Sequence, residues 1–66
     1  MSITCGTDVT WTRPGRTVEG TAGDFVNVHT PFGWVLAASV LVTADAGLYH
    51  PGDVVTVAVA ELEAVA

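Results

Sequence analysis

Lysine is absent from this 66-residue chain, and its only basic residues are Arg13 and Arg16. Seven acidic residues outweigh these two arginines, so the formal net charge at pH 7 is −5. Proteins that follow a nucleic-acid backbone need clustered lysine and arginine. The composition therefore argues against a nucleic-acid partner. The two arginines flank a Pro-Gly turn, where we expect a solvated loop tip or, alternatively, a contact for an acidic partner.

Cysteine occurs once, at Cys5, so the chain cannot form an internal disulfide. A domain of this size buries only about 60% of the surface that its unfolded chain exposes, so its core alone is marginal. A single unpaired cysteine favours a cytoplasmic location. Because no activating base neighbours Cys5, we expect a half-buried thiol rather than a reactive nucleophile.

Long apolar runs are also lacking. The most apolar stretch, residues 34–42, is far shorter than the roughly 20 residues that span a bilayer. The N-terminus shows neither the basic region nor the apolar run of a signal peptide. The sequence therefore predicts one small domain, residues 1–66, without a membrane partner.

Apolar residues nevertheless make up 50% of the chain, and charged residues only 14%, against about 25% in typical domains. A domain this small cannot cover so much apolar surface by itself. Contiguous exposed apolar patches mark contacts with other proteins, and oligomerisation stabilises small folds. We therefore expect a protein partner or a homo-oligomer.

The segment 24–42 predicts two strands joined by a turn. Pro31 suits the second position of a type I turn and Gly33 the fourth, with Thr30 opening it. Alternate residues after the turn share one face, and they are Trp34, Leu36, Ala38, Val40 and Val42. A short buried helix over residues 34–42 is the alternative, but the valines and Trp34 favour a strand.

The remaining chain alternates between strand patterns and turn residues. Strands are predicted at residues 8–13, 17–21 and 53–60, the last with Val55, Val57 and Val59 facing inward. Gly20 suggests a bulge or bend. Turns and loops are predicted at 13–16, 22–24 and 45–52, a single helical turn at 61–63, a short final strand or tail at 64–66, and a loose lead-in at 1–7.

Several short segments carry a family resemblance. They are Asp8-Val9-Thr10-Trp11, Thr17-Val18-Glu19-Gly20-Thr21, and the ending from Pro51 through Val57 to Glu61-Leu62-Glu63. These pieces resemble SH3-like barrels of the Tudor and KOW kind. Residues 23–28 with Gly33-Trp34-Val35 are similar to a pattern of bacterial SH3 domains. The resemblance implies an all-β, small SH3-like barrel of four to five short antiparallel strands with a short 3-10 turn near the C-terminus. KOW modules that bind RNA are basic, whereas this chain is acidic.

Catalytic and metal-binding patterns are not evident. A catalytic site needs a nucleophile, a base and an orienting group together, and His29 and His50 are the only histidines. Asp24, Asp45 and Asp53 do not form a close-spaced ligand motif with them. We therefore expect no enzyme activity, metal, cofactor or small-molecule substrate.

The aromatic side chains are the candidate site residues. Trp11, Phe32 and Tyr49 could form a cage for a methylated cation, with Asp45 or Asp53 as its acidic wall. The alternative places Trp11 and Trp34 in the core, because aromatic residues bury the most area. Phe32, at a turn tip, is the preferred anchor for a partner. The candidate partner-binding residues are Phe32, Trp34, Tyr49 and Trp11.

Two functions fit these expectations. The first is a non-enzymatic protein-interaction module that works through an apolar surface patch. The second is a structural or accessory subunit of a large assembly such as a phage capsid decoration protein, which would place the chain in a virion. A small acidic chain rich in Val, Ala, Thr and Gly suits the second function by association only.

Overall fold

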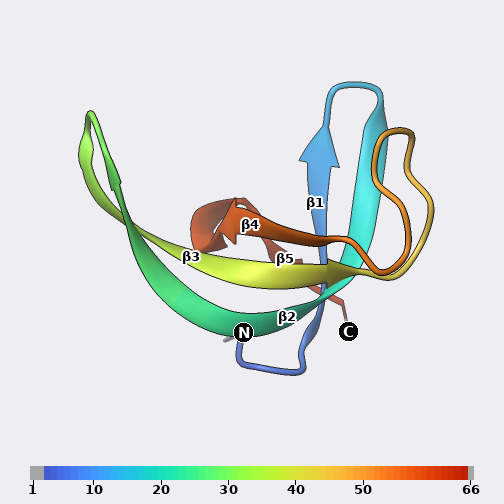
Figure 1. Cartoon of the computed structure of the whole chain (residues 1–66), viewed down its shortest axis with the longest axis horizontal. Helices are drawn as coiled ribbons and strands as arrows, with labels where there is room; N and C mark the ends of the chain where they lie inside the picture. Colours follow the sequence, from blue (N-terminus) through green and yellow to red (C-terminus); the bar gives the residue numbers. More distant parts are fainter. Residues whose placement is uncertain (1–2, 66) are drawn as a thin grey trace.

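The computed structural model describes residues 3–65 as a single five-stranded antiparallel sheet (Figure 1). The strand order across the sheet is β4-β3-β2-β1-β5. The elements in chain order are β1 (Asp8–Arg13), β2 (Arg16–Thr30), β3 (Gly33–Val42), β4 (Val54–Ala58), the 3-10 turn η1 (Val59–Glu61) and β5 (Glu63–Ala64). The all-β prediction and the 3-10 turn near the C-terminus are confirmed. Within the described residues the sheet is open, because β4 and β5 occupy opposite edges.

Strand β2 runs unbroken for 15 residues, so the predicted turn at 22–24 is wrong. The pairing register with β3 shifts between Ala22 and Phe25, and the strand bulges there instead of turning. The lead-in supports this continuity. The Gly6 N–H donates to the Ala22 carbonyl at 2.8 Å, and the Ala22 N–H donates to the Thr7 carbonyl at 2.8 Å. The N–H and carbonyl groups of Ala22 are thereby both hydrogen-bonded, although Ala22 lies beyond the last residue of β2 that pairs with β1, Thr21.

The core lies on the inner face of the sheet around Trp11, which is 1% exposed. The inward pattern predicted for residues 53–60 is confirmed, since Val57 is buried, and Val55 and Val59 are partly buried and pack against the core. The buried cluster consists of Val9, Trp11, Val18, Ala22, Ala38, Val40, Val42, Val57 and Leu62. Most of these side chains are small, so a single tryptophan supplies much of the core volume.

The C-terminal elements begin earlier than predicted. Strand β4 ends at Ala58, and η1 covers Val59–Glu61 rather than residues 61–63. The Leu62 N–H donates to the Val59 carbonyl at 3.1 Å, and the tight turn directs Leu62 into the core. Strand β5 then pairs with Val9 and Thr10 of β1. The last predicted residue of this segment, Ala66, lies outside the described residues.

The outer half of the β2–β3 hairpin, residues 25–36, projects from the body, and we call it the arm (Figure 1). Strand β1 pairs with β2 only as far as Thr21, and β4 pairs with β3 only from Ala37 to Leu41. Within the described residues, the arm is therefore a two-stranded ribbon whose outer backbone edges lack strand partners.

Substitution of Gly20 tests the close packing of β2 against β3. An alanine methyl group there would lie 2.5 Å from Val40 Cγ1 and 2.7 Å from the Leu41 carbonyl oxygen. Since the backbone oxygen cannot rotate away, we expect Gly20→Ala to lower the free energy of unfolding by about 1–3 kcal/mol, measured by urea denaturation.

Gly23→Ala is the matched control. Its methyl group would approach Ser39 Oγ at 3.0 Å and the Ser39 carbonyl oxygen at 3.2 Å, so a smaller loss is expected. A Gly20→Ala protein as stable as the wild type would contradict this account of the packing.

Candidate interaction surface

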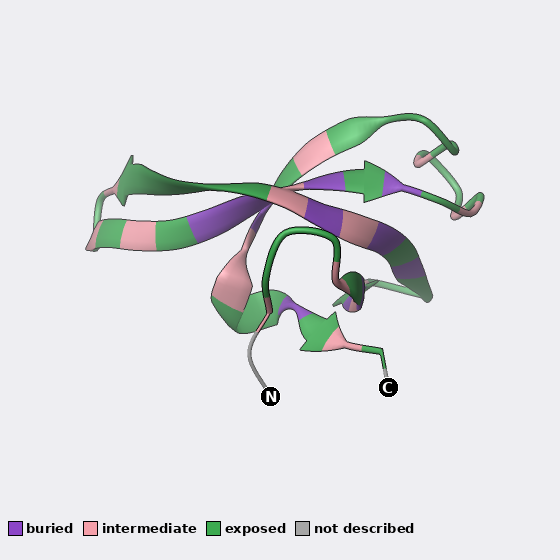
Figure 2. Cartoon of the chain, turned by 90° about the horizontal axis from the view of Figure 1, so that it is seen from below, coloured by how far each residue is buried: buried purple, intermediate pink, exposed green. Residues whose placement is uncertain are grey.

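The inner-face stripe of β3 is covered over only part of its length. Ala38, Val40 and Val42 are buried, as predicted for one face of a strand. On the same face but within the arm, Leu36 is 49% exposed and Trp34 is 72% exposed. Figure 2 shows this change from buried to exposed along the hairpin. The apolar pattern of the core therefore continues onto the arm, where no other strand of the described chain pairs beside it.

Both faces of the arm carry apolar side chains. Residues opposite each other in an antiparallel pair share a face. The register places Val26 opposite Ala37 and Val28 opposite Val35, while Phe25 lies opposite Ala38 on the other face. Phe25, Val26 and Val28 are all exposed. The arm thus presents one valine face and one face with Phe25, Leu36 and Trp34.

The turn at the tip holds Phe32 away from the body. The Phe32 N–H donates to Thr30 Oγ1 at 3.2 Å, and this hydroxyl donates to the Gly33 carbonyl at 2.7 Å. Gly33 has a φ of 112°, a conformation that favours glycine. The predicted turn positions of Thr30, Pro31 and Gly33 are consistent with this arrangement. Phe32 is fully exposed, as expected for a partner anchor rather than a core residue.

The arm carries no formal charge at neutral pH. Residues 25–44 contain no Asp, Glu, Lys or Arg, in a chain whose net charge is −5. The one titratable side chain in this stretch is His29, whose ring lies 5.0 Å from that of Trp34 and is tilted by 52°. The arm therefore combines exposed apolar side chains with an absence of the charges that would oppose close association.

The predicted aromatic cage does not form. Trp11 is buried, and its ring meets that of Tyr49 edge to face with centroids 6.1 Å apart. Phe32 lies at the arm tip, away from the loop that carries Tyr49 (Figure 1). Trp11 is a core residue, as the alternative predicted, but the same prediction for Trp34 is wrong. Trp11 Nε1 is buried and has no hydrogen-bond partner among the described residues.

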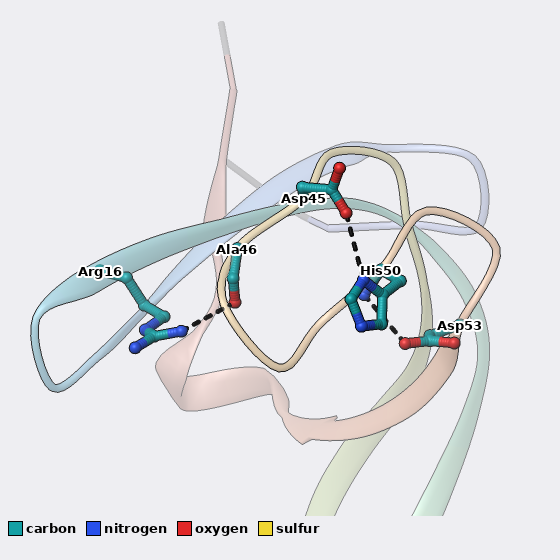
Figure 3. Close-up of polar contacts among 5 residues, drawn as sticks. All are labelled: Arg16, Asp45, Ala46, His50 and Asp53. Carbon is teal, nitrogen blue, oxygen red and sulfur yellow. Dashed lines mark hydrogen bonds and ion pairs between the residues drawn. The ribbon is translucent and has the colours of Figure 1, made fainter.

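The 45–52 loop lies on the opposite side of the body from the arm (Figure 1) and is held by polar contacts (Figure 3). His50 Nδ1 lies 3.2 Å from Asp45 Oδ1, and the His50 N–H donates to Asp53 Oδ2 at 2.9 Å. The His50–Asp45 pair is largely exposed, and such surface pairs contribute little stability. Within residues 3–65, no three or more His, Cys, Asp or Glu side chains gather as a metal site, and no pocket forms.

Both arginines contact other parts of this chain. Arg16 Nη1 donates to the Ala46 carbonyl at 3.1 Å, and Arg13 Nη1 pairs with Glu61 Oε1 at 3.2 Å. The neighbouring Tyr49 side chain and the Glu61 carboxylate raise the pKa of Arg13 above its ordinary value, so the guanidinium stays charged. The arginines therefore brace the loop and η1 against the β1–β2 turn. Cys5 is exposed rather than half-buried.

Sequence reasoning identified Phe32 as a surface residue and named Trp34 both as a partner-binding residue and as a core residue. It missed Phe25, Val26, Val28 and Leu36 as surface residues. Period-two alternation gives the face of a residue but not whether a neighbouring strand covers it. The charge-free stretch from 25 to 44 was the available signal, because a segment this apolar exceeds what the short flanking strands can cover.

No protein-family model, curated protein or solved structure matches this chain. Among the described residues, no helix is long and apolar enough to cross a bilayer.

Replacing the two tryptophans one at a time separates core from surface. Trp11→Ala removes the largest core side chain and should cost about 3–5 kcal/mol of folding free energy, enough to unfold a domain of this size. Trp34→Ala should change stability by only about 0.5 kcal/mol, because its side chain is mostly exposed. Circular dichroism during thermal unfolding compares the two variants. A Trp34→Ala protein that fails to fold would show that the arm is part of the core.

Proposed function

We propose that this protein is a non-enzymatic interaction module whose arm binds another protein chain through its apolar side chains. The observation that carries the proposal is the arm itself, a charge-free ribbon with Phe32 fully exposed at its tip and Trp34 72% exposed beside it. Soluble proteins rarely leave large contiguous apolar surfaces without a use. The exposed area of Phe25, Phe32 and Trp34 alone comes to roughly 400 Å².

The backbone of the arm supports a mode of binding. Extended segments add to exposed sheet edges through main-chain hydrogen bonds, and side-chain contacts then give specificity. The arm offers such an edge along residues 25–30 of β2 and a shorter one along residues 33–36 of β3. We assign binding to these edges together with the aromatic side chains of the arm.

The finer description of the fold, an SH3-like barrel that is open in this chain, belongs to the same proposal. Its support comes from three features of the structure, of which the resemblance implies the bent second strand and the 3-10 turn. Strand β2 bends and carries Gly20, η1 stands between β4 and β5, and β5 returns to pair with β1. On this description the arm is an extension of the hairpin beyond the SH3-like body.

A structural subunit of a larger assembly, such as a phage capsid, is the second candidate function. The specific observation in its favour is that both faces of the arm are apolar, since Val26 and Val28 are exposed on one face and Leu36 and Trp34 on the other. A permanent assembly covers both faces of a ribbon at once.

Alanine substitution at the tip and inner face of the arm tests the interaction. In a pull-down from a lysate of the cells that make this protein, we expect Phe32→Ala/Trp34→Ala to lose the partner captured by the wild type. Truncating central aromatic anchors commonly costs 2 kcal/mol or more, or roughly a 30-fold loss of affinity.

Leu48→Ala is the matched control, because Leu48 is 89% exposed but lies outside the arm. Circular dichroism should show that both variants remain folded. If the arm variant captures the same proteins as Leu48→Ala, the arm is not the binding surface.

A further inference from the structure

We infer that the partner of the arm is a second copy of this chain, joined by antiparallel pairing of the two β2 edges. The inference rests on the proposed function and names the chain that the arm binds. It predicts a two-fold symmetric dimer in which two arms form one continuous four-stranded ribbon.

The β2 edge has the length and symmetry for such pairing. Residues 25–30 extend beyond β1 and have no strand partner on that side within the described chain. Six residues is the usual length of a strand, and the corresponding stretch of β3 is only four residues long. An antiparallel pair of identical strands is related by a two-fold axis, the symmetry of most homodimers.

The side-chain pattern selects one register. Around a two-fold axis perpendicular to the sheet, opposing residues must share a face, so the axis passes beside Asn27 or Val28. With the axis at Asn27, Val26 of each copy lies opposite Val28 of the other, and Asp24 lies opposite Thr30. This register places each of the four valines opposite a valine of the other copy, whereas an axis at Val28 would place Val26 opposite Thr30.

The apolar side chains of the β2 edge strand suit a dimer. Val26 and Val28 are 47% and 37% exposed on one face, and Phe25 is 38% exposed on the other, so pairing of two β2 edges brings apolar side chains of both copies side by side. Trp34 and Leu36 lie on β3, one strand away from the paired edges. A dimer through the arm would also give this small domain stability that it lacks alone.

The charge pattern points to the arm as the place where two copies of this acidic chain can meet. Two chains of net charge −5 repel each other, and carboxylates occur both before and after the arm in the sequence. The segment 25–44 is the longest stretch without charge, so two copies can meet there without bringing acidic side chains together. A basic partner would instead be drawn to the acidic surfaces outside the arm.

Replacing both Val26 and Val28 with glutamate in one variant and with lysine in another tests self-pairing, because only a dimer of the two variants places opposite charges across from each other. Val26→Glu/Val28→Glu places glutamate opposite glutamate in a dimer, and Val26→Lys/Val28→Lys places lysine opposite lysine. By sedimentation velocity, the wild type should have twice the 6.8 kDa mass of one chain. Each double variant alone should associate at least tenfold more weakly, and an equal mixture of the two should recover the dimer.

Val54→Glu is the matched control, since Val54 is a 69% exposed valine on β4, away from the arm. It should dimerise as the wild type does, and circular dichroism should show all variants folded. A wild type that stays at 6.8 kDa up to millimolar concentration, or a mixture that does not recover the dimer, overturns the inference. If the pull-down still depends on Phe32 and Trp34 in that case, the proposed function stands with a different partner.

A cross-linking experiment tests the register. In a Cys5→Ser background, Asn27→Cys should oxidise to a disulfide-linked dimer, because residues opposite each other across paired strands lie within disulfide reach. Thr56→Cys in the same background is the control and should remain monomeric on denaturing gels. A dimer in solution without the Asn27→Cys cross-link would show that the copies meet elsewhere than the β2 edge.

Discussion

The pairing of β2 with β3 holds the packed body and the projecting arm together. Nine residue pairs join the two strands, from Gly20 with Val42 in the body to Thr30 with Gly33 at the tip. The flanking strands add to this ladder only near its base, β1 as far as Thr21 and β4 from Ala37. The direction of the arm is therefore determined by the same hydrogen-bonded ladder that builds the core.

Whether a side chain of the β2–β3 hairpin is buried depends on the elements that pack beside it and not on its hydrophobicity. Val40 and Leu36 occupy the same face of β3, but only Val40 belongs to the buried cluster that residues of β1 and β4 share and against which Val59 of η1 packs. Among the described residues, β1 pairs with the hairpin only as far as Thr21, and β4 pairs with it only from Ala37. The apolar side chains of the arm are exposed because neither strand extends alongside them.

The polar side-chain contacts of the body connect its turns and loops to one another. Arg16 and Arg13 connect the β1–β2 turn to the 45–52 loop and to η1, and Asp53 caps the loop at His50. These contacts use both basic side chains of the protein, and neither side chain belongs to the arm. The arm is left without charge, and its interactions must come from apolar packing and main-chain hydrogen bonds.

The sequence alone determined β1, β3 and the tip turn. Val9 with Trp11 marked β1 by alternation, and Pro31 with Gly33 marked the turn, because both signals depend on residues adjacent in the chain. Only the tertiary structure decided that β2 continues through Ala22, where the lead-in satisfies the backbone, and that Trp34 is exposed while Trp11 is buried. These outcomes depend on which strands, distant in the sequence, pair beside β2 and β3 and on how far that pairing extends. The local residue pattern does not contain this information.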